Sequence, residues 1–303
     1  MPIDLHAALA APAQVEELAW TERDVLLYHL SLGAGRGTDP ELVYTYEPGL
    51  RVLPTFALVA GQGISAGPRL TTGLRLPGLD VDLRRLLHGG QGLVLHTPLP
   101  TSATAVRTTR VIDVWDKGKA AVVVRESRVT TTDGAPLWTS TMRIWARGEG
   151  GFGGGSGPAE EGAPPDRRPD RVIEVATTPD QARLYRLNGD LNPLHIDPES
   201  AAHAGFGAPI LHGLATYGIV ARAVIDALGA GAPERLASYD ARFAGTLLPG
   251  ERLSIAVWHE EGREEGMAEE TWTVEATCVD RGTPVLSHGH VRLVPRTAGF
   301  PVG

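Results

Sequence analysis

The sequence of 303 residues contains a single cysteine, Cys278, which excludes an internal disulfide framework and a multi-cysteine zinc or iron–sulfur site. Long hydrophobic runs are also missing, since no stretch approaches the roughly 18 apolar residues that a membrane-spanning helix needs. Basic residues are outnumbered: 28 Lys and Arg face 36 Asp and Glu, which leaves a net charge of −8. An acidic chain without a basic cluster is a poor candidate for binding nucleic acid.

The two ends of the chain show no targeting signal that we can identify. Residues 1–12 have no basic segment before their apolar stretch, which argues against a secretory signal. Residues 300–303 match neither a retention tag nor a peroxisomal tag. Together with the single cysteine, these features lead us to expect a protein of the reducing cytoplasm.

Glycine and proline are abundant, with 37 and 23 copies, and part of the excess lies in residues 148–170. This segment has few apolar residues to bury and is typical of a flexible linker. It separates an N-terminal domain, residues 1–147, from a C-terminal domain, residues 171–303. A chain of this length is also long enough for two domains of ordinary size.

The two halves resemble weak copies of each other. Leu27-Tyr28-His29-Leu30 recurs as Leu184-Tyr185-Arg186-Leu187, and Pro100 corresponds to Pro249. Any one match can arise by chance, but several matches in the same order favour a duplication.

Each half is predicted to begin with helices and to continue with consecutive strands. Thr21 and Thr178 open a short helix in each half, and Gly189 is expected to end the second one. A more apolar, buried helix is predicted over 209–229, with a shorter counterpart around 53–60. Strands are predicted over 105–114, 119–129, 137–146, 252–259, 270–279 and 285–294. This order predicts an α+β fold with an antiparallel sheet packed against the buried helix.

The segment that follows Gly189 carries the residues best suited to chemistry. Asp190, Asn192, Pro193 and His195 lie within six residues, in a loop just past a helix end. A carboxylate and an imidazole that face one cleft can transfer protons near neutral pH. Asn192 and Pro193 are turn residues that would fix the two side chains relative to each other. An Asp–His pair in a loop is often structural, so the spacing alone leaves both interpretations open.

The neighbouring polar residues have simpler explanations. Asp197 before Pro198 is expected to cap a short helix that ends near His203. His212, at the start of the apolar helix, is expected to be a hydrogen-bonded packing residue. A metal site built from His195, His203 and His212 meets no zinc spacing, so we expect no metal.

Gly213 lies in the predicted first turn of the apolar helix, where backbone N–H groups have no partner within the helix. Such an N–H group can hold a carbonyl oxygen that gains negative charge. Close packing of the helix on the sheet would also explain a glycine at this position.

Residues 185–198, YRLNGDLNPLHIDP, resemble the signature of the MaoC-like, R-specific (type 2) enoyl-CoA hydratases. Further stretches match in order, namely 207–213, 241–244 and 248–250, so the resemblance covers most of the C-terminal half. The N-terminal half resembles the family's degenerate domain more weakly, chiefly through Leu87-His88-Gly89-Gly90-Gln91.

The resemblance implies a double hot-dog fold, in which a curved antiparallel sheet wraps each long helix. It also implies reversible hydration of a trans-2-enoyl-CoA to a (3R)-3-hydroxyacyl-CoA, with an acyl-CoA thioester as partner and without a metal or redox cofactor. By position, Asp190 and His195 would activate the water, and Gly213 would polarise the thioester carbonyl. Asn192, His212 and Arg242 are the residues expected around the substrate. A homodimer is consistent with the family.

The first half departs from the signature where the chemistry is expected. The repeated Leu-Tyr segments are 157 residues apart. At this offset Asp190 corresponds to Gly33, Asn192 to Gly35 and His195 to Thr38, so no acid–base pair is predicted in the first half. Its second helix is short and interrupted by Pro54. We therefore expect this half to complete a pseudo-dimer and to leave room for a long or bulky acyl group.

Two other functions remain open from the sequence. A hot-dog thioesterase would cleave the CoA ester, but enzymes of that type place a carboxylate on or near the central helix, and residues 210–224 contain none. A non-catalytic acyl-CoA-binding module would have no need for both Asp190 and His195. The identity of the carrier, CoA or an acyl carrier protein, is not determined by the sequence.

Overall fold

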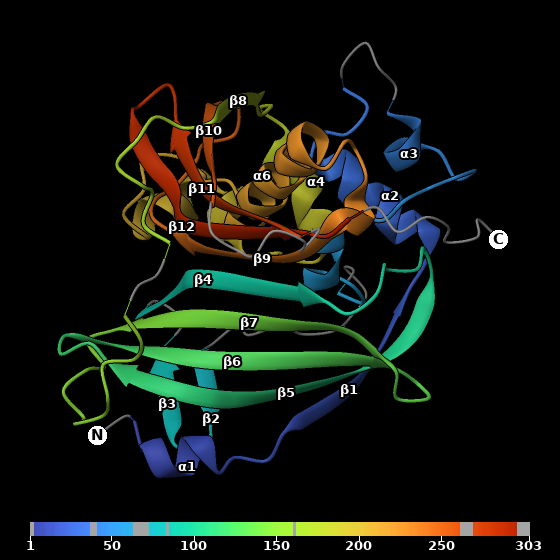
Figure 1. Cartoon of the computed structure of the whole chain (residues 1–303). Helices are drawn as coiled ribbons and strands as arrows, with labels where there is room; N and C mark the ends of the chain where they lie inside the picture. The colour runs from blue at the N-terminus through green and yellow to red at the C-terminus, as the bar shows by residue number, and fades with distance from the viewer. Residues whose placement is uncertain are drawn as a thin grey trace.

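The computed structural model describes residues 3–36, 41–62, 73–82, 85–159, 162–260 and 269–295. In these residues, ten strands form one antiparallel sheet in the order β1-β5-β6-β7-β4-β9-β12-β11-β10-β8. Figure 1 shows β4 to β7 in teal and green below β9 to β12 in orange and red. The strands are β1 (Gln14–Trp20), β4 (Leu86–Leu95), β5 (Ala103–Asp116), β6 (Ala120–Thr131), β7 (Pro136–Arg147), β8 (Arg171–Ala176), β9 (Leu236–Phe243), β10 (Arg252–His259), β11 (Glu270–Cys278) and β12 (Thr283–Leu293).

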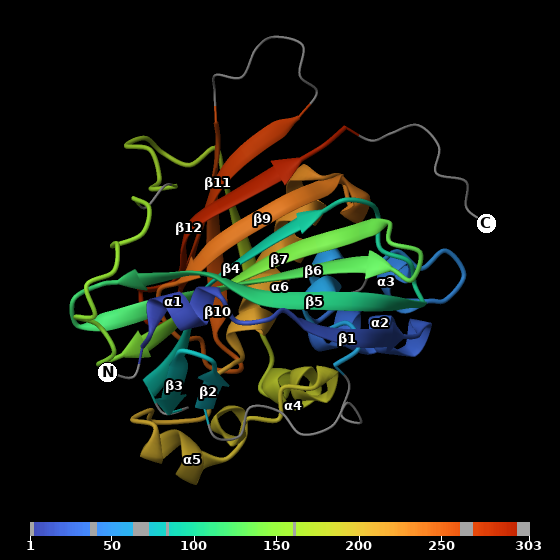
Figure 2. The ribbon, with the colours of Figure 1, turned by 90° about the horizontal axis from the view of Figure 1, so that it is seen from below.

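Helices α2, α4 and α6 pack into the buried core on one face of this sheet, and Figure 2 shows α6 behind the strands. The α-helices are α1 (Leu5–Leu9), α2 (Glu22–Ser31), α3 (Leu42–Thr45), α4 (Gln181–Tyr185), α5 (Pro198–His203) and α6 (Gly213–Leu228). Short 3-10 helices are η1 (Pro54–Leu58), η3 (Arg186–Asn188), η4 (Pro193–His195) and η5 (Pro233–Arg235). None of the helices in the described ranges is long and apolar enough to span a membrane.

The two halves share one sheet and one core. Strand β4 of the first half pairs with β9 of the second, with Gly92 opposite Asp240. Next to this seam, Arg143 on β7 donates a 2.7 Å hydrogen bond to Asp240. The buried apolar cluster beneath the sheet contains residues of both halves, such as Trp138 and Tyr217. The halves therefore behave as one packed unit rather than as two separate bodies.

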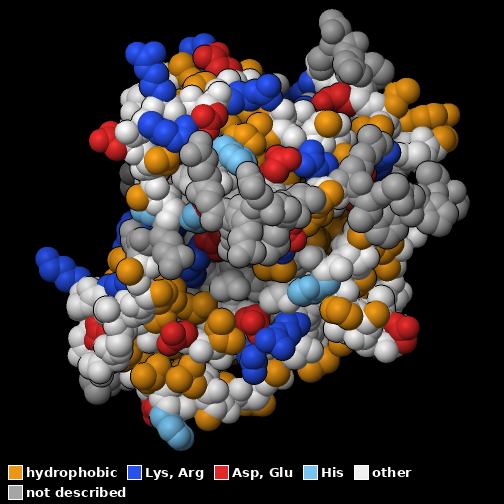
Figure 3. Space-filling model, in the orientation of Figure 1, with side chains coloured by type: hydrophobic (Ala, Val, Ile, Leu, Met, Phe, Trp, Pro, Cys, Tyr) orange, Lys and Arg blue, Asp and Glu red, His pale blue; other side chains and the backbone are white. Residues whose placement is uncertain are grey.

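A second, smaller layer covers the other face of the first-half strands. The hairpin of β2 (Gly73–Leu76) and β3 (Leu79–Asp82) packs there together with Ile3 and Ala8, over Val111, Val123 and other residues of β5 to β7. On the face of the molecule shown in Figure 3, acidic and basic side chains are interspersed.

The segment between β7 and β8 contains no helix or strand in its described residues, 148–159 and 162–170. It is nevertheless attached to the first half. The Asp116 carboxylate accepts hydrogen bonds from the N–H groups of Gly151 and Gly153, at 2.9 and 2.8 Å. These bonds place residues 151–153 against β5, and the flexibility expected of the linker stays a prediction.

The α+β prediction is confirmed, and the six predicted strands are present within about two residues at each end. The long apolar helix begins at Gly213 instead of Pro209, because Leu211 donates its N–H to Leu247 and holds this stretch extended. Helix α4 likewise begins at Gln181, after Thr178. Gly189, with φ of +115°, ends the following 3-10 turn as expected.

The counterpart of α6 in the first half is η1, a five-residue 3-10 helix with Pro54 at its start. The first half therefore has no long central helix among its described residues. This asymmetry agrees with the expected shortening.

Candidate active site

Residues 189–195, which we propose as the catalytic loop, leave η3 through Gly189 and enter η4. Asp190 Oδ1 accepts the N–H of Asn192 at 3.2 Å, and Asn192 Oδ1 accepts the N–H of Leu194 at 3.1 Å. These local bonds fix the carboxylate and start the 3-10 turn that carries His195. Asn192 thus arranges the loop in the way that an Asx turn does.

Asp190 and His195 face each other at the centre of this loop. Asp190 Oδ2 lies 3.9 Å from His195 Nε2. His195 Nδ1 lies 2.9 Å from the carbonyl oxygen of Ile210, which can only accept, so Nδ1 carries the proton and Nε2 keeps its lone pair. A water that donates to both groups through hydrogen bonds of about 2.8 Å spans roughly this separation.

His195 is a neutral imidazole at physiological pH. It is 9% exposed, and burial lowers its pKa, although Asp190 and the Ile210 carbonyl partly oppose that change. The side chain of Asp190 is 55% exposed, so the pair lies between the core and solvent. This arrangement suits a water that arrives from outside and is activated at the edge of the core.

His212 packs directly behind this pair. Its ring stacks on His195 with 3.8 Å between ring centroids, and its Nε2 lies 3.2 Å from the backbone oxygen of Asp190. Burial, with His195 adding to it, lowers the pKa of His212 to about 3. His212 is therefore neutral and links the start of α6 to the catalytic loop.

Gly213 is the first residue of α6, and the first backbone bonds of this helix are donated by Ala215 and Thr216 to His212. Its N–H therefore precedes the helical hydrogen-bond ladder, at the positive end of the helix dipole. A Cβ at Gly213 would lie 3.1 Å from Phe243 Cε1. The glycine thus also satisfies a tight packing requirement.

The first half contributes a residue that the sequence reasoning did not place at the site. His88 on β4 packs its ring against Phe243 at 4.6 Å, and Phe243 in turn covers the first turn of α6. Gln91, which is 2% exposed, accepts from His88 Nε2 at 3.1 Å. Burial lowers the pKa of His88 to about 4, while the nearby Asp190 acts in the opposite direction. The only signal in the sequence was the family resemblance of residues 87–91.

The remaining candidates lie further from the catalytic pair. Asp197 caps α5 through the N–H groups of Glu199 and Ser200, and His203 is exposed at the end of that helix, as expected. Arg242 precedes Phe243 on β9, and alternation along a strand directs its side chain to the opposite face. A contact of Arg242 with substrate stays a prediction.

Three side chains offer possible metal ligands within 4.8 Å of one another: Asp190, His195 and His212. The metal site considered from the sequence had His203 in the position that Asp190 occupies in this group. His212 Nε2 carries a proton, and the two imidazole rings stack instead of converging on one point. The geometry therefore favours proton transfer over metal binding.

The equivalent loop of the first half holds no acid–base pair in its described residues. Gly33 and Gly35 have φ values of +89° and +71°, in the region that glycine adopts readily. Thr38, the counterpart of His195, lies outside the described residues. Thr55, which corresponds to His212, is buried.

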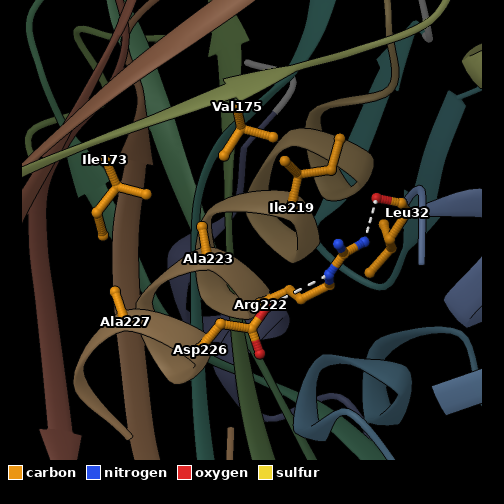
Figure 4. Close-up of a pocket in the computed structure, with 8 residues that line it drawn as sticks. All are labelled: Leu32, Ile173, Val175, Ile219, Arg222, Ala223, Asp226 and Ala227. Carbon is orange, nitrogen blue, oxygen red and sulfur yellow. Dashed lines mark hydrogen bonds and ion pairs between the residues drawn. The ribbon is translucent and has the colours of Figure 1, made fainter. Parts of the chain in front are cut away.

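A pocket of about 350 Å³ lies beside the C-terminal half of α6 (Figure 4). Its apolar wall comes from α6, β8 and Leu32, and its charged end consists of Arg222 and Asp226. Arg222 contacts Asp226 at 3.6 Å and Glu41 at 3.0 Å, so its guanidinium is paired with two carboxylates.

Comparisons with known proteins identify the family of the chain. The profile of the MaoC like domain matches residues 160–279, and that of the MFE-2 hydratase 2 N-terminal domain matches residues 18–148. The enoyl-CoA hydratase ChsH3 of Mycobacterium tuberculosis is 49% identical over 267 residues, which cover 87% of this chain and 91% of that protein.

Two solved structures place the fold. The MaoC-like dehydratase of Phytophthora capsici superposes with a TM-score of 0.84 and 28% identity, and covers 99% of this chain and 100% of that one. A Mycobacterium tuberculosis protein described as a double hotdog fold matches with a TM-score of 0.55 and 11% identity, over 97% of this chain and 98% of that one. The fold is a double hot-dog, and the chain belongs to the MaoC-like hydratase 2 family.

Proposed function

We propose that this protein is a hydro-lyase that adds water reversibly to a trans-2-enoyl-CoA and forms a (3R)-3-hydroxyacyl-CoA. One observation carries the proposal: a carboxylate and a neutral imidazole lie 3.9 Å apart beside the first turn of α6. The relationship to an enoyl-CoA hydratase over most of both chains supports the same reaction.

The reaction requires three contributions from the protein. A base must take a proton from water as its oxygen bonds to C3, an acid must deliver a proton to C2, and a donor must stabilise the thioester oxygen as it gains enolate character. Asp190 Oδ2 and His195 Nε2 both present lone pairs to the bridging water. The water can therefore give a proton to one of these two groups, while its hydrogen bond to the other group orients it.

The proton that reaches C2 is returned by the same pair, so the atoms balance with water as the only co-reactant. The N–H of Gly213 is assigned to the thioester oxygen, because it precedes the helical ladder and the helix dipole favours negative charge there. Asn192 fixes the loop, and His212 supports it from behind.

The thioesterase alternative receives less support. The one carboxylate on α6 is Asp226, which lies at the far end of the helix and pairs with Arg222. Asp226 lies 13 residues from Gly213, which corresponds to about 20 Å along a helix. A carboxylate engaged at that distance cannot activate water at the thioester.

The proposal extends to cofactors, cellular location and oligomeric state. The reaction needs no redox cofactor, and we assign no metal to the Asp190–His195–His212 group. We also propose a cytoplasmic enzyme that acts as a homodimer on acyl-CoA thioesters, with a size measurement in solution as the test of the dimer.

Kinetics of Asp190→Asn and His195→Gln test the assignment. We expect each substitution to lower kcat by about 10²- to 10⁴-fold, because each removes one partner of the water, while circular dichroism shows an unchanged fold. Mass spectrometry with an enoyl-CoA substrate identifies the product: the gain of one water supports hydration, and free CoA supports a thioesterase. Rates like those of the parent in both variants would contradict the site.

A further inference from the structure

Two rings beside the catalytic loop each hold a buried polar atom without a hydrogen-bond partner in the described part of the chain: Tyr185 Oη and His212 Nδ1. Tyr185 and His212 are 2% and 1% exposed, and their ring centroids lie 4.9 Å apart. Buried polar groups in native proteins almost always have a partner, either protein or ordered water. Two such atoms on adjacent rings therefore need a common explanation.

The two atoms have complementary hydrogen-bonding roles. His212 Nε2 faces the backbone oxygen of Asp190 and must donate to it, so Nδ1 carries the lone pair and can only accept. Burial holds the pKa of Tyr185 well above its usual value, so the phenol keeps its proton and can donate. Asp190 also contributes to that pKa, which agrees with a hydroxyl on the side of the catalytic loop.

We propose that Tyr185 is a positioning residue for the reaction, acting through one ordered water that accepts from its hydroxyl and donates to His212 Nδ1. This inference rests on the proposed function of the Asp190–His195 pair. The water would hold His212 in the tautomer with the proton on Nε2. That tautomer is the one that can donate to the backbone of Asp190.

The geometry of the catalytic loop depends on the support that His212 gives it. The side chain of Asp190 is 55% exposed and accepts a backbone hydrogen bond from the N–H of Asn192. The bond from His212 ties the same residue to the start of α6, and the stacking on His195 holds the second member of the pair. A chain from Tyr185 through His212 therefore reaches both catalytic side chains from the buried side.

The substitution Tyr185→Phe removes only the hydroxyl and keeps the ring that packs against His212. We expect kcat to fall about 5- to 10-fold with KM unchanged within about twofold, the scale of one lost hydrogen bond. Tyr28→Phe is the matched control, since Tyr28 is equally buried at 1% and packs in the same core, without a ring contact to His212. We expect Tyr28→Phe to keep the parent's kcat.

Nitrogen NMR of histidine-labelled protein supplies a second readout that does not depend on activity. The His212 signals, identified by their loss in His212→Gln, should show a protonated Nε2 and a bare Nδ1 in the parent, and a mixture of tautomers in Tyr185→Phe. An unchanged tautomer in Tyr185→Phe would overturn the water link, whatever the rates.

A changed tautomer with the parent's kcat would overturn the role in positioning. If the parent itself fails to hydrate enoyl-CoA while the tautomer still changes, the proposed function has failed and the link between Tyr185 and His212 stands.

Discussion

Gly213 supplies a backbone N–H ahead of the helical hydrogen bonds and packs closely against Phe243, and substitutions can separate these two properties. It is the first residue of α6, where proline is well tolerated, and His212 before it has ψ of 135°, which suits a residue that precedes proline. Gly213→Pro removes the N–H, while Gly213→Ala keeps it, and both add a Cβ against Phe243.

We expect Gly213→Pro to lower kcat by about 10²- to 10³-fold relative to Gly213→Ala, as for the loss of one oxyanion donor. Thermal denaturation should show that both variants fold. Equal rates in the two variants would mean that the packing against Phe243, and not the N–H, accounts for this glycine.

The closeness of Asp190 and His195 could be predicted from the sequence because it is local. Asp190 and His195 are five residues apart, and one turn with Asn192 and Pro193 brings them together. His88 could not be predicted in the same way, because its position depends on the pairing of β4 with β9 and on Phe243, which lies 155 residues further along the chain. The unpartnered atoms of Tyr185 and His212 likewise appear only in the folded protein.

At the scale of the elements, His29 joins three segments of the first half. From α2, its Nδ1 donates to Tyr44 O on α3 at 2.9 Å, and its Nε2 accepts the N–H of Leu53, just before η1, at 3.0 Å. The ring is fully buried, and burial lowers the pKa of His29 to about 4. The folded protein therefore holds this histidine neutral.

This burial predicts how stability varies with pH. In the unfolded chain, a histidine binds a proton below about pH 6.5, whereas the folded protein does not until about pH 4, so the free energy of unfolding decreases as the pH falls between these values. The difference corresponds to about 3 kcal/mol for His29. His88 and His212, whose pKa values are also lowered, add to the same trend.

We expect His29→Gln to reduce the slope of stability against pH between about 6.5 and 4 without abolishing it. The variant should also lose about 1–3 kcal/mol at pH 7.5, because two buried backbone groups lose their partner. Urea denaturation at several pH values measures both effects. The exposed His96 provides the control, since His96→Gln should keep the parent's slope, and an unchanged slope in His29→Gln would contradict the prediction.

The boundaries of the helices and strands were predicted with unequal accuracy. Strands such as β10 and β11 could be placed almost to the residue, because alternating side chains and glycine turns are local signals. The start of α6 was placed four residues too early, since Pro209 to His212 are apolar enough to continue a helix. Their extended backbone depends on Leu247, a contact between distant parts of the chain that no periodicity reports.

For the whole molecule, the two halves share an architecture but divide its tasks. The second half carries the loop with Asp190 and His195, and the first half carries glycines at the equivalent positions and supplies His88 through the seam of the sheet. The boundaries that we proposed at residues 147 and 171 coincide with the end of β7 and the start of β8. The shared core nevertheless means that neither half would be complete alone.

The asymmetry of the helices leads to a prediction about substrate size. Helix α6 spans 16 residues, whereas its counterpart η1 spans five, so η1 covers less of α6 than a helix of equal length would. We expect kcat/KM to increase from four-carbon to longer or bulkier enoyl-CoA substrates, by at most about fourfold for each methylene buried. Saturated acyl-CoA inhibitors of the same lengths provide the control, because their affinities should follow the same trend if burial of the chain is the cause. A clear optimum at four carbons would show that the first half closes the pocket instead of leaving room for the acyl group.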